Sequence, residues 1–255
     1  MKGSANMAIC WISHRGESAD APENTLKAFA LAMERNSDGM ECDVRFTSDR
    51  VVVCSHDDNT GRMGSEALIV ADTPYAKLAT LDMSGGKPGY KGEGIARFED
   101  TLKVLKPGKK YFVEIKDSDP EILSSVRNFV RNAGIPAEQI IIIAFDKEVI
   151  RNCSSYCPEF KTLWLTGFQE LSPGRFSPSA PELIAILRDI GADGVDAHGN
   201  LQVIDEDYVR QLKKEGFYFA VWTVDEEEDA RRFMALGVDS ITSNRAAFLK
   251  EKLGQ

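Results

Sequence analysis

Short apolar runs recur along the chain at intervals typical of the strands of an α/β protein. Eight runs fit parallel strands, because each is only a few residues long and is bounded by polar or turn-forming residues. They are residues 8–13, 39–44, 111–116, 140–144, 162–165, 194–196, 217–223 and 240–242. A further run at 51–54 is predicted to be a hairpin partner of the second strand.

Segments with helical periodicity separate these runs. The spacing predicts a helix over 24–36, and further helices at 120–132, 181–190, 206–215 and 226–236. Eight alternating β–α units close a parallel barrel, so the predicted fold class is an α/β (β/α)8 (TIM) barrel. An open doubly wound sheet is the alternative. It usually carries a glycine-rich phosphate loop after its first strand, and the residues after 8–13 do not form one.

An aspartate directly precedes three of the predicted strands, at Asp38, Asp193 and Asp239. This weak internal echo agrees with a repeated β–α unit. Residues 58–95 break the rhythm, because glycines punctuate a stretch with little periodicity. We predict a small irregular insertion there, after the second strand, within a single catalytic domain that spans residues 1–255.

Composition places the chain among ordinary globular proteins, with 43% hydrophobic and 28% charged residues in 255. The net charge of −9 argues against a nucleic acid as the partner, because such binding needs a basic surface. The five cysteines are an odd number without zinc-type spacing, which favours a reducing compartment. Residues 1–7 are too short and polar for a signal peptide, and no run is long enough to span a membrane, so a cytoplasmic protein is predicted.

Carboxylates lie at the ends of two neighbouring predicted strands. Glu41 and Asp43 are spaced i, i+2 and therefore project from the same face of their strand. Glu114 and Lys116 repeat this spacing on the next barrel strand. Because barrel active sites lie at the C-terminal ends of the strands, three converging carboxylates need a cation among them. Oxygen-only ligands favour one divalent ion, Mg²⁺ or Ca²⁺.

Two of the three histidines, His14 and His56, also follow predicted strands. A histidine pair beside a divalent ion suits acid–base chemistry on a phosphate ester, with Arg15 or Lys116 offsetting charge on the phosphoryl oxygens. Each histidine alone is more often a surface or capping residue; the coincidence with the carboxylates favours catalysis. His198 belongs to no such pattern and is predicted to be a loop histidine. Trp222 fits core packing and a substrate wall equally well.

These residues stand in motifs that resemble the glycerophosphodiester phosphodiesterase family. The resemblance covers most of the chain and is most specific in its first fifty residues. It is carried by His14-Arg15-Gly16, Pro22-Glu23-Asn24-Thr25, Glu41-x-Asp43-Val44, His56-Asp57, Val113-Glu114-Ile115-Lys116, Trp222-Thr223-Val224 and Gly237-Val238-Asp239-Ser240-Ile241-Thr242. It implies a metal-dependent hydrolysis of small-molecule glycerophosphodiesters to glycerol 3-phosphate and an alcohol such as choline, ethanolamine or glycerol.

The resemblance also implies roles for individual residues. His14 and His56 are expected to be the acid–base pair, and Glu41, Asp43 and Glu114 the ligands of the divalent ion. Arg15 and Lys116 are expected to contact phosphate, and Trp222 to line the site. The chain departs from the family pattern at 95–98, where Arg97 is expected to alter the mouth, and at 243–245.

Two other functions remain open from the residues. A catalytically silent barrel that binds phosphorylated ligands is disfavoured, because both histidines and all three carboxylates are present. An aldolase- or isomerase-type barrel enzyme commonly uses a strand-end lysine, for which Lys116 is the only strong candidate.

Overall fold

Eight parallel strands form a closed barrel in the computed structural model, which describes residues 9–255. In spatial order they are β1 (Cys10–Ser13), β2 (Gly39–Phe46), β4 (Lys110–Ile115), β5 (Ile140–Ala144), β6 (Lys161–Thr166), β9 (Gly194–His198), β10 (Tyr218–Trp222) and β11 (Ser240–Ser243). The barrel closes because β1 pairs in parallel with both β2 and β11. The predicted (β/α)8 barrel is therefore confirmed; Ala8, the predicted first strand residue, lies outside the described residues.

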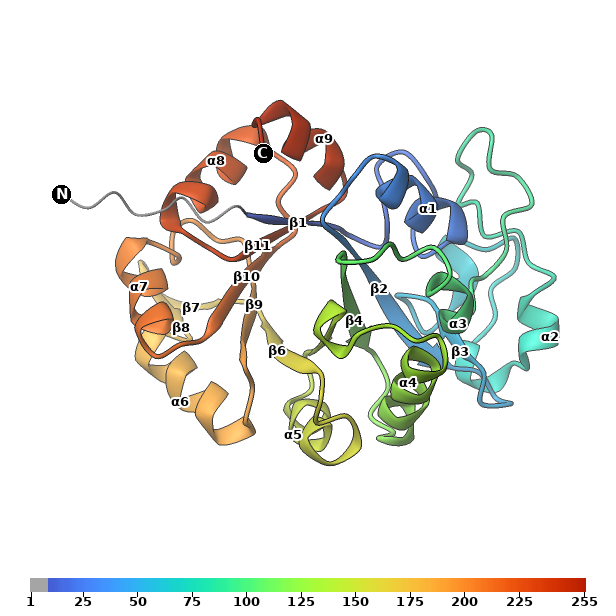
Figure 1. Cartoon of the computed structure of the whole chain (residues 1–255), viewed down its shortest axis with the longest axis horizontal. Coiled ribbons are helices and arrows are strands. Elements are labelled where there is room, and N and C mark those ends of the chain that lie inside the picture. Colours follow the sequence, from blue (N-terminus) through green and yellow to red (C-terminus); the bar gives the residue numbers. More distant parts are fainter. Residues whose placement is uncertain (1–8) are drawn as a thin grey trace.

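Helices surround the barrel, as Figure 1 shows in a view that looks into it. They are α1 (Leu26–Glu34), α3 (Phe98–Thr101), α4 (Glu121–Asn132), α5 (Lys147–Tyr156), α6 (Ala180–Ile190), α7 (Glu206–Lys214), α8 (Glu227–Leu236) and α9 (Ala246–Lys252). Their starts carry local signals: Ser179 and Glu182 form a capping box on α6, and the Asp205 side chain caps α7. Across residues 9–255, no helix combines the length and apolar character that crossing a membrane requires.

The segment between β2 and β4 leaves the regular alternation. It holds β3 (Val52–Cys54), which pairs antiparallel with β2, then the short elements η1 (Thr60–Arg62), η2 (Val70–Asp72) and α2 (Tyr75–Leu78). Val70, Leu78 and Met83 belong to a separate small apolar cluster there. A second addition, the exposed hairpin of β7 (Gln169–Ser172) and β8 (Arg175–Ser177), follows β6 and has no counterpart among the predicted elements. The short helix η3 (Ala137–Gln139) leads into β5.

Apolar side chains fill both sides of the barrel wall. Inside, one cluster comprises Ile12, Phe112, Ile141, Ile143, Leu163, Leu165 and Ala220. The larger cluster lies between the strands and the helices. Strand β5 is buried along its whole length, since residues on both faces of a parallel strand are covered. Ile143 and Leu165 of this interior cluster also line a pocket together with polar groups.

The aspartate that recurs directly before three strands has a structural role. Each carboxylate accepts a backbone N–H from the neighbouring strand: Asp38 Oδ2 from Trp11 at 3.2 Å, Asp193 Oδ2 from Thr162 at 2.8 Å, and Asp239 Oδ2 from Phe219 at 2.7 Å. These bonds satisfy strand N–H groups at the N-terminal end of the barrel, where they would otherwise lose a partner. The repeat therefore serves stability and lies at the end opposite the candidate site.

Candidate active site

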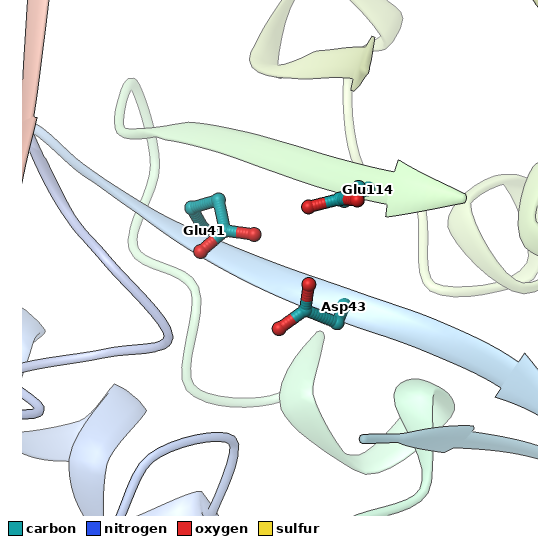
Figure 2. A group of neighbouring side chains, drawn as sticks. All are labelled: Glu41, Asp43 and Glu114. Carbon is teal, nitrogen blue, oxygen red and sulfur yellow. The ribbon is translucent and has the colours of Figure 1, made fainter. Parts of the chain in front are cut away.

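Three buried carboxylates, two from the middle of β2 and one from near the end of β4, project toward one another, as Figure 2 shows. The strand register sets Asp43 directly beside Glu114, and Glu41 lies two residues earlier on the same face of β2. One oxygen from each residue lies within 4.8 Å of the others. Glu41 Oε1 is buried and has no hydrogen-bond partner among the described residues. An orphaned carboxylate oxygen facing two other acids fits a divalent cation held by oxygen ligands.

Two cations sit against this acidic group. Arg15 Nε lies 3.1 Å from Asp43 Oδ2, and Lys116 Nζ lies 2.7 Å from Glu114 Oε1 and 3.5 Å from Asp43 Oδ1. Burial, followed by the charge of Asp43, raises the pKa of Glu41 well above its ordinary value, and raises the pKa of Glu114 to about 7. Burial also acts to raise the pKa of Asp43, but Arg15 and Lys116 outweigh it and hold that pKa at about 2.

The loop after β1 has a backbone that only certain residues allow. Gly16 has φ +81°, and a Cβ there would lie 2.5 Å from the Ala28 backbone, so glycine is required. Arg15 also adopts positive φ, at 54°, which turns its N–H toward Glu41 Oε2 at 2.8 Å. Helix α1 thus packs directly under the loop, and the loop brings His14 and Arg15 over the carboxylates.

Different partners hold the two histidines. His14 Nδ1 lies 2.8 Å from Asn244 Oδ1, and Asn244 donates its own backbone N–H and Nδ2 to the Asp225 carboxylate at 2.8 and 2.6 Å. Burial and then the charge of Arg15 lower the pKa of His14. His56 Nδ1 instead lies 2.7 Å from Asp57 Oδ1. One histidine therefore has a neutral partner and the other a carboxylate.

One pocket of about 110 Å³ joins these groups. Its acidic and basic side is formed by His14, Arg15, Glu41, His56 and Glu114. Its other side is formed by Ile143, Phe145, Leu165, Asp196, Trp222 and Thr242. Phe145 and Trp222 meet edge to face with ring centroids 5.7 Å apart, and the Trp222 indole donates from Nε1 to the Asp196 carbonyl at 3.1 Å. A charged side opposite an aromatic side suits a small substrate with one anionic group.

The structure brings most of the residues singled out from the sequence to this pocket. Asp43 and Lys116 do not line it. Asp43 lies behind the lining with an oxygen within 4.8 Å of Glu41 and Glu114, and Lys116 reaches the carboxylates from an adjoining groove shared with His56 and Arg45. His198 is exposed and stands edge-on to Trp222, with ring centroids 5.4 Å apart. Arg97 pairs with Glu99 and Asp100, away from the pocket lining, so the structure does not support its expected effect on the mouth.

Four residues around the pocket were not singled out from the sequence. Asp57, adjacent to His56, was visible as a neighbour. Asp196 stands two residues before His198 on a strand, the same spacing as Glu41 and Asp43, and that signal was available. Asn244 fell within the departure from the family pattern at 243–245, but its contact with His14 could not be predicted, because the two residues are 230 positions apart. Asp225 gave no signal.

Comparisons with known proteins agree on one group of enzymes. The model of the glycerophosphoryl diester phosphodiesterase family matches residues 14–247. A glycerophosphodiester phosphodiesterase of Caldanaerobacter subterraneus is 29% identical over 241 residues, which cover 91% of this chain and 93% of that protein. The crystal structure of a glycerophosphodiester phosphodiesterase from Parabacteroides distasonis superposes with a TM-score of 0.76 at 26% identity, covering 99% of this chain and 98% of that one.

A phosphodiesterase of Oleispira antarctica, solved in complex with the product sn-glycerol-3-phosphate, shares the fold with a TM-score of 0.83. It is 21% identical and covers 96% of each chain, so this likeness concerns the fold alone.

Proposed function

Because the chain belongs to the glycerophosphoryl diester phosphodiesterase family and is an enzyme of that class, we propose that it hydrolyses glycerophosphodiesters to glycerol 3-phosphate and a free alcohol. One observation carries the proposal. Two histidines and the buried carboxylates Glu41 and Glu114 line one small pocket in the barrel, and the third carboxylate, Asp43, offers an oxygen within 4.8 Å of theirs.

Glu41, Asp43 and Glu114 are proposed to hold one divalent cation, Mg²⁺ or Ca²⁺. Their donor set is entirely oxygen and includes a buried oxygen without a protein partner, which fits a hard cation. When bound, such an ion offsets the negative charge of the phosphoryl oxygens. Arg15 and Lys116, both already next to these carboxylates, are proposed to contact the phosphoryl group from the protein side. Trp222 is proposed to line the substrate.

The different partners of the histidines separate their proposed roles. Asp225 accepts from the Asn244 amide nitrogen, which leaves the amide oxygen facing His14, so His14 Nδ1 carries the hydrogen of that bond. His14 Nε2 then has no hydrogen-bond partner among residues 9–255, and we assign it to take a proton from the water that is consumed in the hydrolysis. His56 Nδ1 is held by the Asp57 carboxylate, which fixes the orientation of the ring and leaves Nε2 as its other nitrogen. We assign His56 to protonate the leaving alkoxide oxygen.

Release of glycerol 3-phosphate from a panel of glycerophosphodiesters tests this function. The enzyme is expected to release it with Mg²⁺ or Ca²⁺ present and to stop in EDTA, with activity restored by excess cation. Undiminished rates in EDTA would reject the metal assignment. Binding of glycerol 3-phosphate without any hydrolysis would favour the alternative, a silent barrel that binds phosphorylated small molecules. We further propose that residues 1–255 act as one catalytic domain.

A further inference from the structure

Asp196 is a pocket carboxyl that the roles assigned above leave unused. It projects from β9, is 1% exposed, and lines the pocket opposite the metal carboxylates. Its Oδ1 is buried and has no hydrogen-bond partner among residues 9–255. A buried carboxyl oxygen without a partner costs stability, since it loses its bonds to water and gains none from the protein. Such a group facing a substrate pocket points to a ligand that supplies the missing bond.

Thr242, on β11, repeats this feature. It is 1% exposed and lines the same pocket, and its Oγ1 likewise has no partner in the described part of the chain. Between the two strands lies β10, whose Ala220 is in register with Asp196 on one side and Ser240 on the other. Alanine contributes only a methyl group there. Asp196 therefore has no polar neighbour on β10 at its own level. Asp196 and Thr242, hereafter the floor pair, both line the pocket.

The surroundings of the floor pair indicate what it binds. Leu165, Phe145 and Trp222 form the apolar part of this side of the pocket. The enclosed volume of about 110 Å³ is well below the 300–1,000 Å³ usual for drug-sized ligands, so the bound group is small. A small group with carbon atoms to pack on apolar side chains, and hydroxyls to pair with a carboxyl and a threonine, is a short polyol.

We propose that the floor pair binds the hydroxyl groups of the substrate's glycerol moiety and so determines the preference for glycerophosphodiesters over diesters that lack hydroxyls. This inference rests on the proposed function, since it names the part of that substrate which these residues contact. The phosphoryl group then lies toward Arg15 and the metal carboxylates, on the opposite side of the same pocket.

Two other ligands fit the floor pair less well. A metal ion is disfavoured because the carboxylates close enough to share one are Glu41, Asp43 and Glu114, and Asp196 is not in that group. A cationic head group would need an ionised carboxyl, whereas burial and then the charge of Glu114 raise the pKa of Asp196 well above its ordinary value. A protonated carboxyl both donates and accepts, as a hydroxyl partner requires.

The test measures kcat/KM of each variant with two substrates. One is sn-glycero-3-phosphoglycerol, and the other is bis(4-nitrophenyl) phosphate, a diester without hydroxyl groups. A third diester, sn-glycero-3-phosphocholine, carries a cationic head group and serves as a control. For Asp196→Ala, the ratio of kcat/KM for the first substrate to that for the second should fall about 10- to 100-fold, the usual scale for leaving a substrate hydroxyl unpaired. Thr242→Val, which removes only the hydroxyl, should lower the ratio in the same direction. Asp196→Asn should stay within about 3-fold, because an amide also donates and accepts.

If Asp196→Ala does not fold, the isosteric Thr242→Val variant decides alone, and an unchanged ratio in it would overturn the proposal. An unchanged ratio in both Asp196→Ala and Thr242→Val would overturn the proposal. Equal falls of this ratio in Asp196→Ala and Asp196→Asn would also overturn it, because the substrate preference would then depend on the charge of Asp196 and not on its hydrogen bonds. A loss confined to sn-glycero-3-phosphocholine would assign Asp196 to a cationic head group and also overturn it. Failure of the wild-type enzyme to release glycerol 3-phosphate from any diester would instead refute the proposed function itself.

Discussion

Replacing Glu41 with Gln should make the metal-free enzyme more stable while removing its activity. Glu41 Oε2 accepts the Arg15 N–H at 2.8 Å, and a Gln oxygen can keep that bond. The Gln amide nitrogen would then stand where Oε1 now faces two other carboxylates without a partner. The substitution therefore removes one negative charge from a buried acidic group and adds a donor to it.

The geometry sets the size of the effect. Two unit charges 4.8 Å apart repel by about 3.5 kcal/mol at an effective dielectric constant of about 20. Proton uptake by Glu41 already relieves part of this repulsion, because the pKa of Glu41 in the folded enzyme is raised above its ordinary 4.5. A raised folded pKa means that wild-type stability falls as pH rises above 4.5. The gain from Glu41→Gln should thus be small near pH 5 and grow toward pH 8, to a size on the order of 3 kcal/mol.

Urea unfolding in EDTA at pH 5 and pH 8 measures this gain. Saturating Mg²⁺ or Ca²⁺ should stabilise the wild type, by about 2.7 kcal/mol at 100 times its Kd, and should not stabilise the variant. Glu228→Gln, which removes a charge from an exposed position of α8, is the matched control and should show neither effect. Equal or lower stability of Glu41→Gln at pH 8 would refute the argument that these carboxylates repel one another without a cation.

Other predictions concern the histidines and their supports. His14→Ala or His56→Ala should lower kcat at least about 100-fold, the usual scale for losing a general acid or base. The circular dichroism spectrum should not change. Wild-type-like turnover by either variant would refute the acid–base assignment. Asn244→Leu should lower kcat about 10-fold, since it removes one hydrogen bond that positions His14, worth about 1.5 kcal/mol. A kcat unaffected by that substitution, measured at saturating substrate, would contradict the positioning role.

Much of the barrel was predictable because its strands are short apolar runs with helical segments between them. The elements that were not predicted lack a clear apolar pattern. Helix α5 has a narrow apolar face at Val149, Ile150 and Cys153, and the β7–β8 hairpin has no buried residue to set a period of two. The aspartate echo was visible, but its use as an acceptor for neighbouring strands depends on pairing that only the closed sheet defines.

The candidate site divides in the same way. Glu41, Asp43 and Glu114 could be found because strand-end side chains at i, i+2 share a face, and β2 and β4 are neighbours in the barrel. The spacing of Asp196 and His198 was visible, but neither the floor pair nor Asn244 could be assigned to the pocket, since they reach it from strands and loops at least 82 residues beyond Glu114. Local spacing locates chemical groups, whereas packing across the barrel decides which of them face each other.

The closure of the barrel by β1 and β11 has a consequence for how the enzyme is made. Every group proposed for proton transfer or metal binding lies between residues 14 and 116, and a ribosome completes that stretch before the second half exists. His14 nevertheless depends on Asn244, and Glu17 accepts the Ala247 N–H across the same 230-residue separation. Contacts so distant in sequence form late in folding. The nascent chain therefore carries its whole set of reactive side chains well before it has an active site, and catalysis begins only when the last strand docks.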